Sequence, residues 1–164
     1  MTRIVQYDAV VVGGGPSGAT AATTLARAGR SVLLLDRAGR IKPCGGAVPP
    51  RAIRDFDIPD SQIVAKARCA RMIAPSNKTV DMPVGNNGYV GMVDREHFDE
   101  WLRARAALAG AERRTGTYEA LERDADGTAI IVYREPNSGD LIRVRAKSVI
   151  GADGARSGVA RGNL

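Results

Sequence analysis

The chain has 164 residues, 44% of them hydrophobic and 26% charged, which is ordinary for one globular domain with a core of its own. It contains no apolar run of about 18 residues, so no transmembrane helix is expected, and its polar start lacks the apolar segment of a signal peptide, which favours a cytoplasmic protein. The net charge of +6 comes from scattered arginines without interleaved aromatic residues, a pattern that does not favour nucleic-acid binding.

The N-terminal part of the sequence is typical of a strand–helix–strand unit. Residues 7–12 are rich in valine and end at a glycine, so they predict a buried strand. Residues 17–28 are mostly small and predict a helix that ends at Gly29, and residues 31–35 predict a second buried strand. In such a unit the two strands are expected to be parallel neighbours in one sheet.

A glycine-rich loop, Gly-Gly-Gly-Pro-Ser-Gly at residues 13–18, joins the first strand to the helix and fits the G-x-G-x-x-G pattern in its required context. Gly13 permits the tight turn, Gly15 lets the backbone approach a pyrophosphate, and Gly18 lets the helix pack against the strand. The helix N-terminus presents N–H groups to that anion. Asp36, which closes the second strand, can accept hydrogen bonds from a ribose diol and disfavours a 2′-phosphate. These residues predict a dinucleotide site without distinguishing FAD from NAD.

The next stretch of the chain is richer in turns than the first. Residues 37–50 predict a loop of glycine and proline, and residues 51–56 predict a short helix. Residues 67–93 predict short strands and turns.

An amphipathic helix is predicted over residues 95–109. Phe98, Leu102 and Leu108 supply its apolar residues among many charged ones. Asp94 precedes them and is a plausible N-cap, because its carboxylate can accept a backbone N–H of the first turn.

The C-terminal part predicts a third parallel strand at residues 112–117, followed by an antiparallel meander. Strands at residues 128–133 and 141–146 flank a turn at residues 137–139, and a further core strand covers residues 148–151. The sequence therefore predicts an α/β fold: a Rossmann-like, dinucleotide-binding domain with a parallel sheet and an antiparallel β-meander.

Three segments, in this order along the chain, resemble the flavoprotein hydroxylase superfamily. They are the glycine-rich loop at 13–18, Asp-Arg-Glu-His-Phe at 94–98, and Gly-Ala-Asp-Gly at 151–154. The resemblance implies that the dinucleotide is FAD and that Arg95 contacts it. It also implies that Asp153 lies near the flavin pyrophosphate and the path of the nicotinamide.

The loop at residues 43–46, Pro-Cys-Gly-Gly, resembles more specifically the geranylgeranyl reductases of (bacterio)chlorophyll biosynthesis. In that family the loop lies beside the isoalloxazine ring, which makes Cys44 the catalytic candidate, either as a contact that tunes the flavin or as a proton donor. Cys44 and Cys69 do not have a metal-ligand spacing, and with His97 as the single histidine we expect no metal. The resemblance implies a cofactor site made of Gly13, Gly15, Pro16, Ser17, Gly18, Asp36, Arg37, Cys44, Gly45, Gly46, Arg95, Ala120 and Asp153.

The same resemblance implies an FAD-dependent oxidoreductase of photosynthesis. Such an enzyme saturates the geranylgeranyl double bonds of (bacterio)chlorophyll, or of its diphosphate precursor, to give phytyl. The implied electron donor is NADPH or another donor. The implied partner is a small molecule with an isoprenoid tail, which suggests peripheral contact with the photosynthetic membrane and no nucleic acid. The sequence carries no signal for an oligomeric state.

Members of this family are much longer than 164 residues. We therefore interpret residues 1–164 as an N-terminal fragment of the FAD-binding domain, in which residues 67–93 begin an insertion that belongs to the substrate domain. On this interpretation the domain is incomplete, the C-terminal half with the family's later Gly-Asp motif is absent, and the fragment alone is expected to be inactive.

Two rival functions remain open from the sequence. A flavin-dependent aromatic monooxygenase would have the same fold, although the Pro-Cys-Gly-Gly loop argues against it. A non-catalytic, truncated dinucleotide-binding module is the rival from another class. A plain NAD-dependent dehydrogenase is a more distant third, because nothing else in the sequence resembles its hydride-transfer site.

Overall fold

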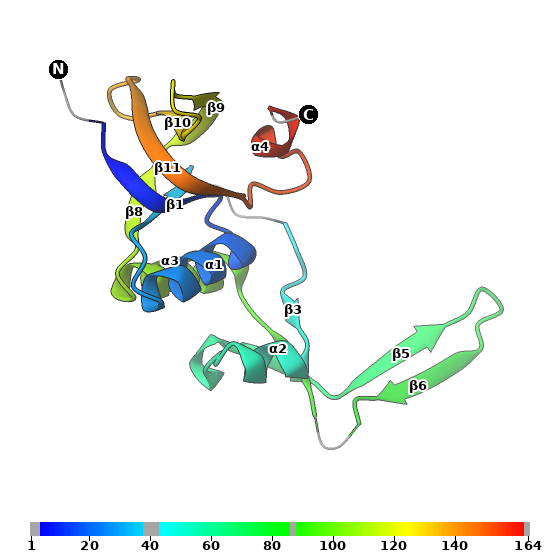
Figure 1. Ribbon diagram of the computed structural model, residues 1–164. Coiled ribbons are helices and arrows are strands. Elements are labelled where there is room, and N and C mark those ends of the chain that lie inside the picture. The colour runs from blue at the N-terminus through cyan, green and yellow to red at the C-terminus, as the bar shows by residue number, and fades with distance from the viewer. Residues whose placement is uncertain (1–3, 38–42, 86–87, 163–164) are drawn as a thin grey trace. The chain divides into compact units, whose positions relative to one another are not determined.

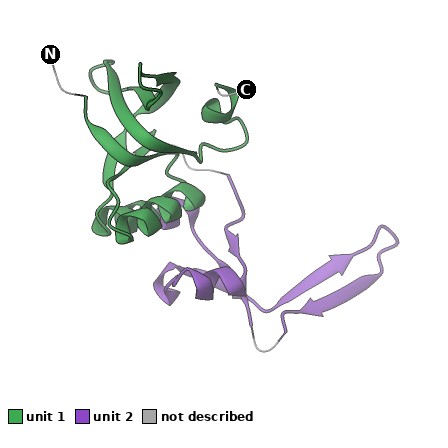
Figure 2. Cartoon of the chain, in the orientation of Figure 1, with its two compact units in different colours: residues 1–40, 99–164 green, residues 41–98 purple. Residues whose placement is uncertain are grey.

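The computed structural model describes residues 4–37, 43–85 and 88–162, and the chain divides into two compact units. Unit 1 comprises residues 1–40 and 99–164, and unit 2 comprises residues 41–98 (Figure 2). The glycine-rich loop belongs to unit 1, whereas the Pro-Cys-Gly-Gly loop belongs to unit 2.

Three parallel strands begin the sheet of unit 1. They are β1 (Gln6–Val12), β2 (Val32–Asp36) and β8 (Glu112–Thr115), with β2 between the other two. This confirms the predicted strand–helix–strand unit and the predicted third parallel strand. Residues 32–35 are all buried, as expected for a continuous apolar run inside a parallel sheet.

An antiparallel meander completes this sheet, as the sequence predicts. It consists of β9 (Thr117–Arg123), β10 (Ala129–Arg134) and β11 (Leu141–Gly151). The resulting six-stranded sheet has the order β8-β2-β1-β11-β10-β9 (Figure 1).

The strand β11 differs from the prediction of two separate strands at 141–146 and 148–151, which was wrong. It is one strand of 11 residues that pairs antiparallel with β10 as far as Ala146 and parallel with β1 as far as Gly151. The charge of Lys147 does not interrupt it, because this side chain is exposed and its Nζ lies 2.7 Å from Oδ1 of Asp8.

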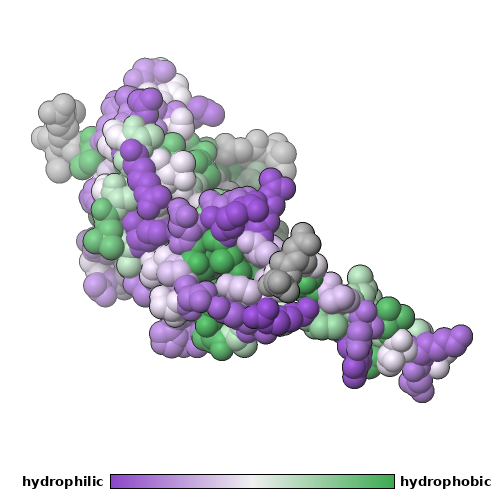
Figure 3. Space-filling view, turned by 90° about the horizontal axis from the view of Figure 1, so that it is seen from below, coloured by the Kyte–Doolittle hydropathy of each residue, from purple (hydrophilic) through white to green (hydrophobic). Residues whose placement is uncertain are grey.

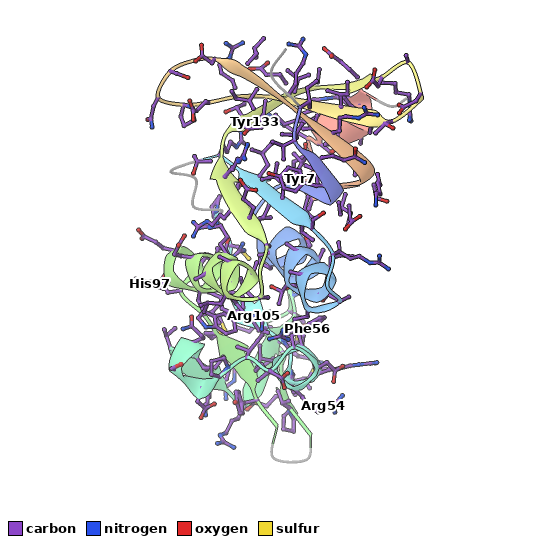
Figure 4. All side chains as sticks on the ribbon, turned by 60° about the vertical axis from the view of Figure 1, so that its left-hand side comes forward. Tyr7, Arg54, Phe56, His97, Arg105 and Tyr133 are labelled. Atoms are coloured by element: carbon purple, nitrogen blue, oxygen red, sulfur yellow. The ribbon has the colours of Figure 1, made fainter. Side chains whose placement is uncertain are left out.

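Two helices lie side by side against one face of this sheet. They are α1 (Pro16–Arg27) and the part of α3 (Arg95–Leu108) that belongs to unit 1 (Figures 1 and 4). Gly29 follows α1 with a φ of +73°, a conformation that suits glycine, and this confirms the predicted helix end. At the other helix, the N–H of Glu96 donates to Oδ1 of Asp94 at 3.0 Å, as expected of an N-cap.

The apolar face of α3 was predicted incorrectly at its C-terminal end. Phe98, Leu102 and Ala106 are buried, whereas Leu108 is 90% exposed. Residues four apart share one face of a helix, so these three buried residues form a stripe that does not include position 108.

Two tyrosines of the core of unit 1 hydrogen-bond to charged side chains at its edge. The hydroxyl of Tyr7 donates to Oε2 of Glu112 at 2.5 Å, and Nη1 of Arg114 donates to the hydroxyl of Tyr133 at 3.0 Å (Figure 4). Burial, and then the hydrogen bond to Glu112, raise the pKa of Tyr7 to about 12. The core itself consists of Tyr7, Val10, Val12, Leu33, Leu35, Ile131, Tyr133, Val144, Ala146 and Val159.

Unit 2 is built from short elements. A three-stranded sheet has the order β3-β7-β4, and β5 pairs with β6 in a separate two-stranded sheet. The elements are β3 (Ala47–Val48), α2 (Pro50–Asp55), the 3-10 turn η1 (Asp60–Gln62), β4 (Ala65–Ala67), β5 (Cys69–Ile73), β6 (Thr79–Pro83) and β7 (Val90–Met92). The helix predicted at 51–56 and the strands predicted within 67–93 are thereby confirmed.

The β5–β6 hairpin exposes apolar side chains, which are visible on the arm at the right of Figure 3. Met72 pairs with Val80, and Met82 lies opposite Ala70, so these residues share one face of the hairpin. Met72, Val80 and Met82 are each more than half exposed. Within the described part of the chain, no helix has the length and apolar character needed to span a membrane.

Candidate dinucleotide site

The glycine-rich loop follows β1 and begins α1, and its three motif glycines have different surroundings. A Cβ on Gly13, where φ is +107°, would lie 2.4 Å from the carbonyl oxygen of Ala152, and a Cβ on Gly18 would lie 1.8 Å from that of Gly13. A Cβ on Gly15 would meet nothing within 4 Å among the residues that the structure describes. The fold of unit 1 therefore requires Gly13 and Gly18, whereas Gly15 leaves an open space beside the backbone.

This open space lies at the N-terminus of α1. Gly15 is the N-cap residue, and Pro16 occupies the first turn. No side chain in the described part of the chain caps this end. The first N–H groups of a helix lack partners within the helix and carry a partial positive charge, so they favour an anion. Ser17 is exposed in the same turn.

The loop also lies where the order of the parallel strands changes direction. The chain passes from β1 to β2 on one side, while β11 lies on the other side of β1. The N–H of Gly13 donates to the carbonyl of Leu35 at 2.8 Å, and the N–H of Ala152 donates to that of Val12 at 2.7 Å. Crevices at this kind of switch point, at the carboxyl ends of parallel strands, are where open α/β sheets bind ligands.

Asp36 ends β2 beside the loop. Its side chain is 27% exposed, and its Oδ2 lies 3.4 Å from Nη1 of Arg103 in α3. The same nitrogen donates to the carbonyl oxygen of Gly14 at 3.2 Å. The sequence did not single out Arg103, because a lone arginine on a helix surface has no motif and its partner is 67 positions away. Arg37 is exposed directly after Asp36.

Asp153 lies on the opposite side of the loop, and its backbone nitrogen would be 2.8 Å from a Cβ on Gly13. Its Oδ2 accepts the N–H of Gly158 at 2.6 Å, at the start of the short helix α4 (Gly158–Arg161). Desolvation alone would raise the pKa of Asp153, but hydrogen bonds from Ser157 and from backbone N–H groups hold it below its usual range. Its Oδ1 is buried and has no hydrogen-bond partner among the described residues.

We predict that Asp153→Asn destabilises the protein by about 1 kcal/mol at neutral pH, because the charged oxygen that accepts the N–H groups of Gly158 and Val159 is lost. The folded-state pKa is depressed, so this contribution is complete above the unfolded pKa of about 4 and is lost as the pH falls through the folded value. Urea denaturation of both proteins from about pH 7 to pH 3 should therefore show their difference shrinking towards acid. A difference that does not change with pH would contradict this assignment.

The predicted residues of unit 2 are placed within that unit. Cys44 and Gly45 are exposed, and Arg95 is half-buried in the first turn of α3. Gly46 has a φ of +69°, and its carbonyl accepts the N–H of Val93 at 2.9 Å. A Cβ on Gly46 would lie 2.1 Å from the carbonyl oxygen of Val93, so this glycine fixes the path of the loop.

The structure thus brings together one group of the predicted residues in unit 1. Gly13, Gly15, Gly18, Asp36 and Asp153 surround the turn between β1 and α1. Ala120 is separate from them in the sheet: it lies in the middle of β9, opposite Val132, and two strands stand between β9 and β1.

The residues of unit 1 fit a dinucleotide with an unphosphorylated ribose. Gly15 leaves space for a pyrophosphate at a helix N-terminus, and Asp36 offers a carboxylate at the end of the adjacent strand. The buried Oδ1 of Asp153, which has no partner among the described residues, adds an acceptor on the other side of the loop. Among the described residues, no group of three or more acidic, histidine or cysteine side chains could hold a metal ion.

The chain is similar to geranylgeranyl diphosphate reductases from bacteria and plants. The chain is 61% identical to the geranylgeranyl diphosphate reductase of Rhodobacter capsulatus over 94% of its length, which covers 39% of that protein. It is 38% identical to the chloroplastic geranylgeranyl diphosphate reductase of Oryza sativa over 92% of its length, which covers 35% of that protein. The chain therefore spans less than half the length of these relatives.

Solved structures share the fold. A geranylgeranyl bacteriochlorophyll reductase-like protein from Thermoplasma acidophilum has a TM-score of 0.81 and 31% identity, and the match covers 93% of this chain and 40% of that one. The p-nitrophenol 4-monooxygenase of Pseudomonas putida also has a TM-score of 0.81, with 22% identity, covering 98% of this chain and 44% of that one. The latter likeness concerns the fold alone. Residues 6–162 match the FAD binding domain family, and the chain belongs to that family.

Proposed function

We propose that this chain is the FAD-binding part of an FAD-dependent reductase that saturates the double bonds of a geranylgeranyl chain. The observation that carries the proposal is the similarity to geranylgeranyl diphosphate reductases along nearly the whole chain. The surroundings of the motif glycines and of the carboxylates beside them support a dinucleotide site in unit 1. The proposed substrate is a geranylgeranyl group on (bacterio)chlorophyll or its diphosphate precursor, and the proposed product is phytyl.

The residues of unit 1 are proposed to hold FAD. Gly13, Gly15 and Gly18 let the backbone and the N-terminus of α1 receive the pyrophosphate, together with Pro16 and Ser17. Asp36, followed by Arg37, receives the adenosine ribose, and Asp153 supplies an acceptor beside the loop.

Residues outside this cluster complete the proposed site. Arg95 is proposed to contact FAD, Ala120 is proposed as a further contact from β9, and the loop of Cys44, Gly45 and Gly46 is proposed to face the flavin ring. The exposure of Cys44 supports a role in contact with a ligand rather than in the core.

When bound, FAD supplies the hydride-transfer chemistry, and NADPH is the proposed source of electrons. The chain's own residues bind and orient the cofactor. Residues 67–93 are proposed to begin the substrate domain. The apolar face of the β5–β6 hairpin is exposed, which supports the proposal that the rest of this domain packs against it. We also propose that the enzyme is cytoplasmic. The isoprenoid tail of the proposed substrate supports peripheral contact with the photosynthetic membrane.

The test begins with the purified protein, titrated with FAD and followed by visible absorbance and flavin fluorescence. The full-length protein is then incubated with NADPH and geranylgeranyl diphosphate, and the product is weighed by mass spectrometry. The proposal expects the mass to rise by two hydrogen atoms for each double bond reduced, without oxygen consumption coupled to turnover. Cys44→Ser should keep FAD binding. Loss of most of the turnover in this variant would identify the thiol as the proton donor, and full turnover would exclude that role.

Each rival function has its own outcome in this test. NADPH oxidation coupled to oxygen uptake with an aromatic substrate would instead show a monooxygenase. FAD binding without turnover of either substrate by the full-length protein would show a non-catalytic dinucleotide module.

A further inference from the structure

The guanidinium of Arg103 links three parts of the dinucleotide site. Its Nη1 lies 3.2 Å from the carbonyl oxygen of Gly14 in the loop and 3.4 Å from Oδ2 of Asp36 at the end of β2. The side chain of Arg103 is only 17% exposed although it comes from the surface of α3. One cation therefore ties the loop, the second strand and a helix together within unit 1.

A second acidic residue holds this arginine in place. Nε of Arg103 donates to Oε2 of Glu100, one turn earlier in α3, at 3.1 Å. Glu100 is itself bound by both terminal nitrogens of Arg113 in β8, each at 2.7 Å. The bidentate pair fixes the carboxylate, and the carboxylate then restricts the rotamers open to Arg103.

Gly14 explains how Asp36 comes so close to the loop. A Cβ at this position would lie 2.6 Å from Oδ2 of Asp36 and 2.8 Å from its Cβ, so any larger residue would displace the carboxylate. Gly14 occupies a variable position of the G-x-G-x-x-G pattern, yet its missing side chain is the space in which Asp36 packs. The carboxylate is thus held on one side by the loop and on the other by Arg103.

We propose that Arg103 is a positioning and specificity-determining residue of the dinucleotide site. It holds Oδ2 of Asp36 and leaves Oδ1 to accept hydrogen bonds from the adenosine ribose. In turn, Asp36 neutralises a guanidinium that would otherwise attract a 2′-phosphate at the same place. This inference rests on the proposed cofactor site, and it adds that the selection against a phosphorylated ribose depends on the pair rather than on Asp36 alone.

The experiment measures binding of two probes, adenosine diphosphate and adenosine 2′,5′-bisphosphate, by calorimetry and by competition with FAD. Arg103→Met should weaken binding of adenosine diphosphate about tenfold, since the ribose acceptor loses its orientation. Asp36→Ser should raise the affinity for the 2′-phosphate probe about tenfold, because the guanidinium is uncovered. Arg103→Met added to Asp36→Ser should remove that gain completely.

Two controls separate positioning from general effects. Arg143→Met removes an equal charge from an exposed pair with Glu122, also at 3.4 Å, and should leave both probes unaffected. Arg103→Lys keeps the charge and should restore part of the adenosine diphosphate affinity. Thermal melts of all variants show whether each is folded, and the gain of affinity in Asp36→Ser is an effect that a merely structural arginine would not produce.

The outcomes distinguish the inference from the proposed function. A wild-type protein that binds FAD and adenosine diphosphate, with Asp36→Ser gaining nothing for the 2′-phosphate probe or keeping its gain without Arg103, overturns the inference alone. A folded wild-type protein that binds neither FAD nor adenosine diphosphate overturns the cofactor site and the inference with it.

Discussion

Gly15→Ala should leave the protein as stable as the wild type and weaken FAD binding at least tenfold, or by about 1.4 kcal/mol. Within residues 4–37, 43–85 and 88–162, a Cβ at Gly15 meets no atom within 4 Å, and the residue has an extended backbone with φ −71° that alanine adopts readily. The added methyl group would instead occupy the space in which a pyrophosphate approaches the helix N-terminus. Flavin fluorescence titration measures the loss of affinity, and urea denaturation measures the stability.

The same substitution at Gly18 is the matched comparison, and its main effect should be on the stability of the protein. Its Cβ would lie 1.8 Å from the carbonyl oxygen of Gly13, so the loop or the helix must move, at a cost of about 3 kcal/mol or more. Gly18→Ala should therefore unfold at a much lower urea concentration. If Gly15→Ala bound FAD as tightly as the wild type, the cofactor would not approach the backbone at this glycine.

Leu33→Ala should destabilise the protein by about 2–5 kcal/mol. Leu33 is the second residue of β2, is completely buried and belongs to the main core, so the substitution removes apolar contacts and leaves a cavity. Denaturation in urea, followed by far-ultraviolet circular dichroism, gives the free energy of unfolding. FAD affinity should change little in conditions where the variant remains folded, because Leu33 pairs with Val10, three residues before the glycine-rich loop.

Leu108→Ala is the matched control, since the change in side chain is the same. Leu108 is 90% exposed at the end of α3, and removing it should change the free energy of unfolding by less than about 0.5 kcal/mol. Equal losses in the two variants would mean that position 108 is covered in solution, contrary to the structure.

The parts of the site that could be predicted from the sequence are those whose residues are neighbours in the chain. The glycine-rich loop, the helix after it and Asp36 lie within one strand–helix–strand unit, so their spacing alone predicts their arrangement. Asp153 was identified by the resemblance of Gly-Ala-Asp-Gly to a flavoprotein motif, and the structure places it two residues after the end of β11.

The parts that could not be predicted depend on tertiary contacts. Arg103 is one of many arginines in the sequence, and only the packing of α3 brings its guanidinium to Asp36. The strands predicted at 141–146 and 148–151 form one strand in the structure, and the charge of Lys147 between them is paired with Asp8, a contact that the sequence does not show. Leu108 is as apolar as a core residue, but it lies outside the buried stripe of α3 and is therefore exposed.

The continuous strand β11 has a consequence for how unit 1 unfolds. Its first residues are hydrogen-bonded to β10, its last residues to β1, and Arg145 and Ala146 are paired with both neighbours. The meander and the nucleotide-binding strands therefore share one backbone, and neither can lose its ladder without exposing the other. Unit 1 should behave as a single cooperative folding unit. The strand ends that carry the glycine-rich loop should then be as resistant to local unfolding as the meander.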